Sequence, residues 1–349
     1  MIFGYAENCR TENSYELMDI TVVLCTFNRC QQLRTALESV ALSIMPEGVA
    51  WDVLVVDNNS KDDTRQVVSE ISNIYPGRFR YLFEGRPGKS YALNTGIAEA
   101  SGEYLAFMDD DVTVDSTWLQ NLIAPLHESK WAGVGGRVFP QWTSAPPRWL
   151  AKESWVVTGP LVYFDRGEQG HDLGEAPVGT NMAFRKRVFE QVGGFRTDLG
   201  PSPHNEIRNE DSEFARRLMR SGQNIYYEPS AVVYHFVTPE RLRKKYMQDW
   251  WFDKGRSDTR ETGIPRDMHW RIGGVPFHLF VRLVRWTAQW MLTFQPQERF
   301  ECKLKAWLNA GIITECRTLS KRGAPKQEIE SRRAVPGSQL DKGGIETNL

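Results

Sequence analysis

From residue 19 the sequence alternates between short apolar runs and segments with helical periodicity, and this alternation limits the available folds more than any other feature. Residues 19–27, DITVVLCTF, and 51–57, WDVLVVD, have the length and composition of buried strands. Each run precedes a segment in which apolar residues recur every three or four positions, as on one face of a helix. Strands that alternate with helices are typical of a mainly parallel sheet, so we expect an α/β fold.

The alternation breaks at about residue 140, where a segment rich in proline and tryptophan predicts an irregular insertion over a site. Strand and helix patterns then return as far as His235, and from about residue 240 the pattern is helical. We therefore predict an N-terminal extension at 1–18, an α/β domain at 19–237 with halves at 19–139 and 140–237, a helical extension at 238–320, and a disordered polar tail at 321–349.

The composition narrows the classes of partner. With 41% hydrophobic and 25% charged residues the chain is in the ordinary globular range, and its net charge of -1 argues against nucleic acid as the main partner. Its five cysteines form no Cys-x-x-Cys pair, which argues against a disulfide framework or a zinc site. The first 19 residues lack the pattern of a signal peptide, so we expect a cytoplasmic protein.

Polar residues follow three of the apolar runs directly. They are Thr26, Asn28 and Arg29 after the first run, Asp57, Asn58, Asn59 and Ser60 after the second, and Asp109, Asp110 and Asp111 after the run YLAFM. In open α/β sheets ligands bind beyond the carboxyl ends of the strands. The sequence therefore predicts that these three groups converge on one site.

The three consecutive aspartates pose a physical problem, because adjacent carboxylates repel one another. A hard divalent cation among them would relieve this repulsion, whereas the alternative is a solvated turn. If the chain is still extended there, Asp109 and Asp111 point to one side and Asp110 points away. The position directly after a buried run favours the cation.

Three further polar positions each allow two interpretations. Glu210 and Asp211 begin an amphipathic segment, where an acidic side chain either stabilises the helix start or serves as a general base; spacing alone favours the helix start. His235 ends the run AVVYH and is either structural or a metal ligand. Lys89 lies in GRPGKS, which lacks the first glycine of a P-loop, so it is either a point charge for a phosphate or an exposed loop lysine.

In their order along the chain, these motifs resemble the family 2 glycosyltransferases of the inverting GT-A type. The resemblance covers roughly residues 19–237 and depends on VVLCTFNR, VVDNNSKDDT, GKSYALNTGIAEASGEYLAFMDDD, GTNMAFRKRVFEQVGGF and NEDSEFARRL. It implies a GT-A (Rossmann-like) fold, with a mostly parallel mixed sheet, flanking helices and a C-terminal helical extension. It also implies a nucleotide-diphosphate sugar as donor, with a UDP-sugar favoured, and Mn²⁺ or Mg²⁺ as cofactor.

The resemblance assigns roles to individual residues. Asp211 matches the catalytic base, and Asp111 and His235 match the metal ligands. The residues that it implies at the nucleotide-sugar are Thr26, Asn28, Arg29, Asp57, Asn59, Lys89, Asp109 and Asp110. Trp142 and Trp155 either stack on acceptor sugar rings or anchor the irregular segment, and with Asn181 and Glu210 they form the acceptor set that we predict.

The predicted function is metal-dependent, inverting transfer of a single sugar to a hydroxyl of a glycan or lipid-linked acceptor, in bacterial cell-surface polysaccharide or glycolipid biosynthesis. Transfer of one sugar is expected because QDWWFDKGRSD has Trp251 where the family's processive motif has arginine. One alternative is a nucleotidyltransferase, although TFNRCQQ lacks the glycine-rich loop of that class. The other is a non-catalytic relative that binds glycans or nucleotides.

Residues 275–294 are apolar except for one polar stripe of His278, Arg282, Arg285 and Gln289. A helix with a basic stripe suits the interface of an anionic membrane, which would make the protein peripheral to the cytoplasmic face of the inner membrane. It equally suits packing on the catalytic domain or on a second subunit in a homodimer. The sequence leaves both interpretations open.

Overall fold

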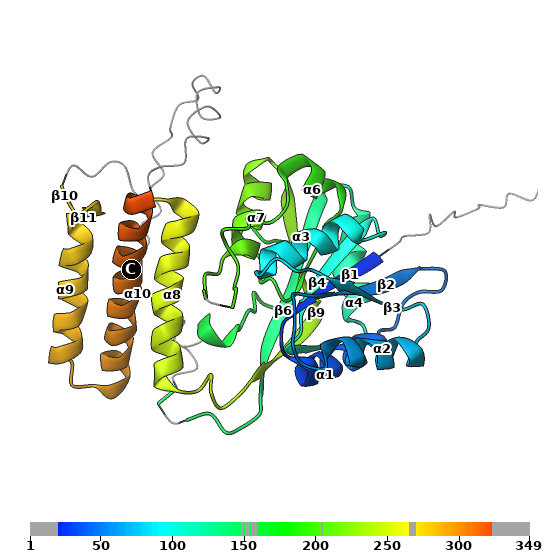
Figure 1. Ribbon diagram of the computed structural model, residues 1–349, viewed down its shortest axis with the longest axis horizontal. Helices are drawn as coiled ribbons and strands as arrows, with labels where there is room; N and C mark the ends of the chain where they lie inside the picture. Colours follow the sequence, from blue (N-terminus) through cyan, green and yellow to red (C-terminus); the bar gives the residue numbers. More distant parts are fainter. Residues whose placement is uncertain are drawn as a thin grey trace, which may run out of the picture.

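The computed structural model describes residues 20–147, 149–150, 154, 156, 159–203, 205–264 and 270–322. Figure 1 shows an α/β domain beside a layer of three long helices. The strands of the main sheet follow the order β3-β2-β1-β4-β8-β6-β9-β5, with β7 on β9. Their bounds are β1 Ile20–Thr26, β2 Trp51–Asp57, β3 Phe79–Phe83, β4 Tyr104–Asp109, β5 Val112–Val114, β6 Trp131–Trp142, β7 His171–Asp172, β8 Met182–Arg185 and β9 Asn224–Val237.

The first four strands are parallel and alternate with helices, which confirms the predicted α/β class. The connecting helices are α1 (Cys30–Ala41), α2 (Thr64–Ile74) and α3 (Lys89–Glu99). Every residue of β1 is buried, because α1 and α2 pack on one face of the sheet and α3 on the other. A strand covered on both faces reads as a continuous apolar run, which is why the sequence revealed it.

The second half of the sheet is mixed. β8 is antiparallel to both β4 and β6, and β6 is parallel to β9. The sequence-based prediction missed β5 and β6. It also divided β9 into two strands, whereas β9 is one strand whose pairing with β6 shifts register between Gly136 and Arg137. The glycines of β6 lower its intrinsic strand preference, so its neighbours β8 and β9 define it.

Short helices complete the α/β domain. They are α4 (Trp118–Ile123), the 3₁₀ turns η1 (Ala124–His127) and η2 (Gly159–Leu161), α6 (Arg187–Val192) and α7 (Glu210–Arg220). The helix predicted over residues 115–129 is therefore shorter, because Pro125 has no amide proton to donate and the chain tightens to a 3₁₀ turn there. Trp118 of α4 is buried on the face covered by α1, and Phe214 of α7 is buried on the face covered by α3.

The C-terminal layer consists of α8 (Lys244–Thr262), α9 (Phe277–Leu292) and α10 (Pro296–Arg322), with a small hairpin of β10 (Arg271–Ile272) and β11 (Val275–Pro276). α10 lies between α8, which faces the α/β domain, and α9, which lies farthest from it (Figure 1). Trp251 of α8 is buried with Leu304 and Leu308 of α10 and with Val237 of β9, so one apolar cluster joins the layer to the α/β domain. Among the described residues no helix is both long enough and apolar enough to cross a membrane.

Parts of the predicted organisation lie outside the described residues. These are the N-terminal extension at 1–18, Trp155, and residues 323–349 of the predicted tail. Residues 321 and 322, which the prediction placed in the tail, are the last two residues of α10.

Candidate functional site

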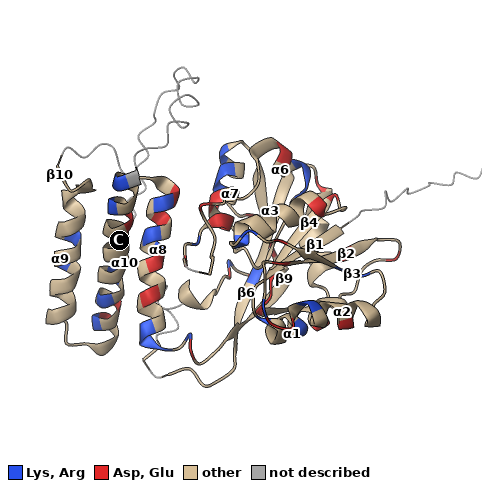
Figure 2. Cartoon of the chain, viewed as in Figure 1, with Lys and Arg blue, Asp and Glu red and all other residues tan. Residues whose placement is uncertain are grey.

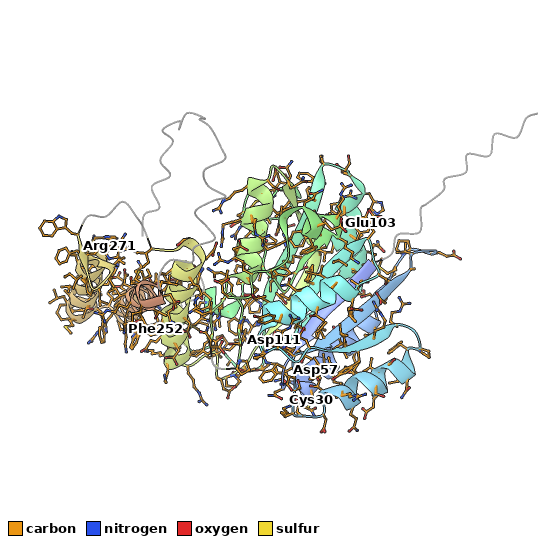
Figure 3. All side chains as sticks on the ribbon, turned by 45° about the horizontal axis from the view of Figure 1, so that its top comes forward. Cys30, Asp57, Glu103, Asp111, Phe252 and Arg271 are labelled. Carbon is orange, nitrogen blue, oxygen red and sulfur yellow. The ribbon has the colours of Figure 1, made fainter. Side chains whose placement is uncertain are left out.

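A cavity of about 1010 Å³ opens at the carboxyl ends of the parallel strands. Its walls are the loops after β1 and β4, residues 176–180 before β8, the start of α7, and one side of α8. Asp57 and Asp111 mark this end of the sheet in Figure 3. The cavity thus joins segments that are far apart in the sequence, at the edge where α/β sheets bind their ligands.

Asp110 is bound tightly inside this cavity. Thr26 Oγ1 donates to its Oδ2 at 2.8 Å, and Arg29 Nη1 donates to its Oδ1 at 2.9 Å. Burial raises the pKa of Asp110, and the charge of Arg29 offsets only part of this effect. β4 ends at Asp109 and β5 begins at Val112, so Asp110 and Asp111 lie in a turn. The predicted alternation is therefore wrong, and all three aspartates line the cavity.

Asp111 is surrounded by positively charged and hydrogen-bonding groups. Arg241 Nη2 donates to its Oδ2 at 2.7 Å and Arg29 Nη1 at 3.1 Å, while His235 Nε2 lies 3.6 Å from the same oxygen. Burial raises the pKa of Asp111, but its interaction with His235 and the charges of Arg241 and Arg29 outweigh burial and hold the pKa well below its usual range. Asp111 is therefore a buried, ionised carboxylate.

The pair of Asp111 and His235 fits a divalent cation. A carboxylate oxygen and an imidazole nitrogen 3.6 Å apart can both bind one ion at about 2.1 Å. His235 Nδ1 is buried and has no hydrogen bond within the described residues, so the ring proton can move there without breaking a bond and leave the Nε2 lone pair available. The described ranges hold no cluster of three or more His, Cys, Asp or Glu suited to a metal, so other ligands would have to come from a substrate or from water.

Lys89 connects the aspartate loop to the start of α7. Its Nζ donates to Asp109 Oδ1 at 2.6 Å and lies 3.6 Å from Glu210 Oε1. Burial raises the pKa of Glu210 to about 7; the charge of Lys89 opposes this shift and that of Asp211 adds to it. Lys89 is thus a paired ammonium group on the cavity wall, rather than an exposed loop lysine.

Asp211 lies in the first turn of α7, where its carboxylate is fixed from two directions. Gly179 N donates to Oδ2 at 2.8 Å, and Ser212 N and Oγ donate to Oδ1 at 2.6 and 3.0 Å. A Cβ at position 179 would lie 2.7 Å from Asp211 Oδ2, so the contact depends on glycine. These bonds fix the direction of the Asp211 carboxylate at the cavity. The bond from Ser212 N also satisfies an amide at the start of α7, so a role as general base is compatible with a role in stabilising the helix start.

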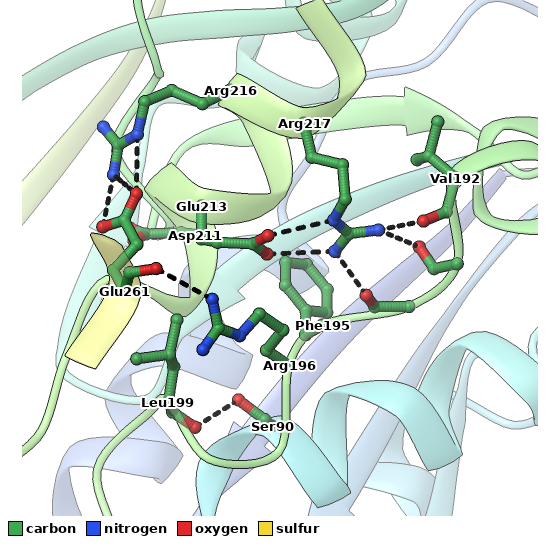
Figure 4. Close-up of polar contacts among 12 residues, drawn as sticks. Ser90, Val192, Phe195, Arg196, Leu199, Asp211, Glu213, Arg216, Arg217 and Glu261 are labelled. Carbon is green, nitrogen blue, oxygen red and sulfur yellow. Dashed lines mark hydrogen bonds and ion pairs between the residues drawn. The ribbon is translucent and has the colours of Figure 1, made fainter. Parts of the chain in front are cut away.

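The helical layer anchors the start of α7. Asn209, the residue before the helix, has φ 77° and ψ 13°, and its Nδ2 donates to Asp258 Oδ1 at 2.7 Å and to Glu261 Oε2 at 2.8 Å on α8. Glu261 also accepts from Arg216 of α7, as Figure 4 shows beside Asp211. The segment that carries Glu210 and Asp211 is therefore attached to α8 by hydrogen bonds and ion pairs.

Three predicted nucleotide-site residues lie outside the cavity lining, on the adjoining loops. Asp57 is buried and accepts bonds from Ser60 N and Tyr81 Oη, both at 2.8 Å. Asn28 accepts from Lys61 N at 2.7 Å and joins the loops after β1 and β2. Asn59 has φ 68° and meets Lys61 Nζ. Their contacts brace the two loops, whereas Thr26, Arg29, Lys89 and the three aspartates line the cavity itself.

The predicted acceptor set is divided. Glu210 lines the cavity, whereas Asn181 is fully buried and its amide group is satisfied by Trp118 Nε1, Arg137 O and Ala231 O. Trp142 packs against the apolar cluster between β9 and α8, outside the cavity lining. The prediction for Asn181 is therefore wrong, because all of its hydrogen-bonding capacity holds β6, β9 and α4 together. Trp142 anchors the chain, as its alternative interpretation predicted.

Asn58, one of the predicted strand-end residues, and several residues that the sequence did not single out also line the cavity. Asn58 Nδ2 donates to Arg86 O at 2.6 Å and its Oδ1 accepts from Gly88 N at 2.7 Å, which fixes the loop before Lys89. Arg241 follows His235 by six residues, and Tyr246 and Trp250 come from α8. Of these residues, only Arg241 could have been suspected from the sequence, because it closely follows His235. Tyr246 and Trp250 gave no such signal, because α8 is far along the chain from the other parts of the cavity.

The fold and the site define a class of protein. A mannosyltransferase, PcManGT from Pyrobaculum calidifontis in complex with GDP-Man and Mn²⁺, superposes with a TM-score of 0.52 at 19% identity, over 86% of this chain and 73% of that one. This likeness shows a shared GT-A fold, with the mixed sheet, flanking helices and C-terminal helical region predicted from the sequence.

Residues 21–193 match the family profile described as glycosyl transferase family 2. The chain belongs to this family and is therefore a glycosyltransferase. A glucosyl-dolichyl phosphate glucuronosyltransferase of Haloferax volcanii is 28% identical over 62% of this chain and 69% of its own length. The succinoglycan biosynthesis protein ExoM of Rhizobium meliloti is 26% identical over 70% of this chain and 75% of its own.

Proposed function

We propose that this glycosyltransferase is metal-dependent and inverting, and that it moves one sugar from a nucleotide-diphosphate donor to a hydroxyl of a glycan or lipid-linked acceptor. The main observation in support is that Asp111, His235 and Asp211 line one cavity, which therefore holds both a candidate metal pair and a fixed carboxylate. The similar mannosyltransferase was solved with GDP-Man and Mn²⁺, which supports both the donor class and the cofactor. We favour a UDP-sugar as donor.

Asp111 and His235 would hold Mn²⁺ or Mg²⁺ together with the diphosphate. Such an ion, when bound, neutralises the negative charge that grows on the departing nucleoside diphosphate. Arg29 and Arg241 both contact Asp111, and Lys89, the first residue of α3, contacts Asp109, so three cations of the chain surround the proposed diphosphate site. They can exchange their carboxylate contacts for phosphate oxygens.

Asp211 is the proposed general base. A carboxylate whose oxygens are oriented by Gly179 N and Ser212 N can take the proton of the acceptor hydroxyl as that oxygen attacks the anomeric carbon. One displacement from the face opposite the leaving group inverts that carbon, and no second carboxylate is needed as a nucleophile. Glu210 beside it contacts Lys89 instead and is assigned to the acceptor wall.

Transfer of a single sugar agrees with the role of Trp251. The residue that replaces the arginine of the processive motif is buried in the helical layer, where its Nε1 donates to Val156 O at 2.6 Å. Its neighbour Trp250 lines the cavity and offers a ring for a sugar.

We further propose that residues 19–237 form the catalytic domain and that residues 238–320 extend it. The relatives' names support a role in cell-surface polysaccharide or glycolipid biosynthesis, and we propose that the enzyme works in the cytoplasm.

The experiment is a thermal unfolding series with UDP, GDP and other nucleoside diphosphates, each with Mn²⁺ and with a chelator. We expect one diphosphate to raise the melting temperature only when Mn²⁺ is present. Asp111→Asn should lose this metal-dependent shift, whereas Asp211→Asn should keep it and lose sugar transfer from the matching nucleotide-sugar. A shift undiminished by the chelator would refute the metal-bridged site, and full transfer by Asp211→Asn would remove Asp211 as the base.

A further inference from the structure

The outermost helix, α9, exposes a continuous apolar face. Residues at alternating steps of four and three along the helix fall on its outer side, and all are exposed: Phe277, Val281, Val284, Ala288 and Met291. We call these five residues the outer apolar face. Val284, at its centre, is 68% exposed. A stripe with this spacing lies on one side of a helix and is normally buried.

The opposite side of α9 already has its partner. Leu279 and Leu283 pack against Ile313 and Cys316 of α10, so the inner side accounts for the attachment of the helix to the layer. In Figure 1 α10 and α8 separate α9 from the α/β domain, and none of the described residues covers the outer apolar face. Packing of α9 on the catalytic domain, one of the sequence-based alternatives, therefore does not occur.

The exposed apolar surface continues beyond both ends of the helix. Trp270 and Ile272 extend it at the N-terminal end, and Leu292 and Phe294 extend it at the C-terminal end, where Phe294 is 97% exposed. The helix has 16 residues and is thus about 24 Å long, which suits a helix lying along a surface rather than across a bilayer.

Charge around this surface has one dominant sign. Between residues 270 and 305 there are six arginines and lysines and two glutamates, a local excess of four positive charges in a chain of net charge -1. Residues 270–297 contain no acidic residue, and Figure 2 shows α9 without red. Lys303 and Lys305 of α10 lie 5.0 and 4.6 Å from the rings of Trp290 and Trp286, on the side of α9 that faces α10, and they add to the positive charge of this region.

Arg282 and Lys305 line a small groove between α9 and α10, whereas Arg285 is open to solvent. Arg282, Arg285, Lys303 and Lys305 form no ion pair within the part of the chain that the structure describes. Arg285 is exposed directly beside Val284. An apolar strip with an exposed arginine on its flank, in a segment without acidic residues, is complementary to lipid acyl chains and anionic headgroups.

The same charge disfavours a second copy of the chain as the occupant. The midpoint of α9 lies between Val284 and Arg285, so a two-fold pairing of α9 about its midpoint would bring the two Arg285 side chains together. α9 has no carboxylate to place between them, and like charges in contact oppose association. Anionic lipid supplies the missing negative charge.

We propose that the outer apolar face of α9, with Arg285 on its flank and the positive charge of the surrounding segment, docks the protein on the surface of an anionic membrane. The helix lies in the headgroup region, and α10 and α8 hold the cavity about two helix diameters, roughly 20 Å, away from it. Docking therefore sets the location of the enzyme and leaves the cavity accessible to its substrates.

The experiment is vesicle flotation of the full chain with phosphatidylcholine alone and with equal parts of phosphatidylcholine and phosphatidylglycerol. We expect binding to the anionic vesicles, at least tenfold weaker binding for Val284→Glu/Met291→Glu, and about fivefold weaker binding for Arg285→Ala. Ile74→Glu is the matched control, since Ile74 on α2 is 64% exposed and far from α9. It should bind like the unmodified chain.

Unfolding temperature and light scattering accompany the flotation. All variants should unfold as the unmodified chain does, because the substituted side chains are exposed. Absence of binding to anionic vesicles, or binding that Val284→Glu/Met291→Glu leaves unchanged, would overturn the proposal. A dimer that this double variant converts to a monomer, without vesicle binding by either, would overturn it in favour of a second copy.

Discussion

Substituting Asn209 separates the contribution of its backbone conformation from that of its side chain. The residue is buried in the left-handed region at φ 77°, directly before Glu210 and Asp211. Its side chain donates to two carboxylates of α8, Asp258 and Glu261, and accepts from Lys254 Nζ at 3.1 Å. Asn209→Gly removes these bonds but keeps the backbone relaxed, whereas Asn209→Ala removes them and strains it.

The magnitudes follow from the contacts. A hydrogen bond to a charged group stabilises by about 1.5–3 kcal/mol, and Asp258 and Glu261 keep their partners Lys254 and Arg216 in the variants. We therefore expect Asn209→Gly to lower the free energy of unfolding by about 3 kcal/mol. Alanine in the left-handed region costs about 1 kcal/mol more, so Asn209→Ala should be the less stable variant.

The assay is urea unfolding monitored by the fluorescence of the chain's twelve tryptophans. Asn59 provides the control, because it has a similar φ of 68° but its side chain, within the described residues, hydrogen-bonds only to the exposed Lys61. There Asn59→Ala should again be about 1 kcal/mol less stable than Asn59→Gly, while Asn59→Gly stays near the unmodified chain. Equal stability of Asn209→Gly and the unmodified chain would refute the anchoring of α7 by α8.

Two further substitutions test burial and packing. Glu210 has its pKa raised from 4.5 to about 7, mainly by burial, so the folded protein should lose stability as the pH rises from about 4.5 to 7. Glu210→Gln should abolish this slope and gain up to roughly 3 kcal/mol relative to the unmodified chain above pH 7; parallel pH profiles from urea unfolding in chelator would contradict the assignment. Gly255→Ala should destabilise the protein by about 1–3 kcal/mol, because its Cβ would clash with Leu308 O where α8 meets α10. Gly85→Ala, with only one contact at 3.5 Å, should unfold within about 0.5 kcal/mol of the unmodified chain, and an equal loss in both variants would show that the helix contact is not tight.

Residues near one another in the chain made much of the fold predictable. β1, β2 and β4 are covered on both faces and appear as continuous apolar runs, and α7 shows its amphipathic spacing. The same local logic placed Asp109 to Asp111 at the end of β4, whereas the strand predicted to end at His235 continues to Val237. β6 escaped prediction because its glycines carry little strand preference, and its identity comes from pairing with β8 and β9.

The candidate site was likewise only partly predictable from local sequence. Local pattern selected candidate site residues, but a polar residue next to a strand end has the same sequence signature whether it lines a cavity or braces the protein. Asn181 was assigned to the acceptor, whereas three partners from distant segments use all of its amide group. Arg241 and Trp250 reach the cavity only because α8 folds back across it.

By itself the sequence determined the α/β class, the family motifs and the identity of the carboxylates, because these depend on periodicity and residue type within short stretches. Only the tertiary structure decided which carboxylate meets which cation, which side of α9 is left uncovered, and how α8 fixes Asn209 before the proposed base. Those outcomes depend on contacts between residues such as Asp111 and Arg241, which are 130 positions apart. The free energy of such contacts comes from burial and charge at the assembled site, which no short stretch of sequence contains.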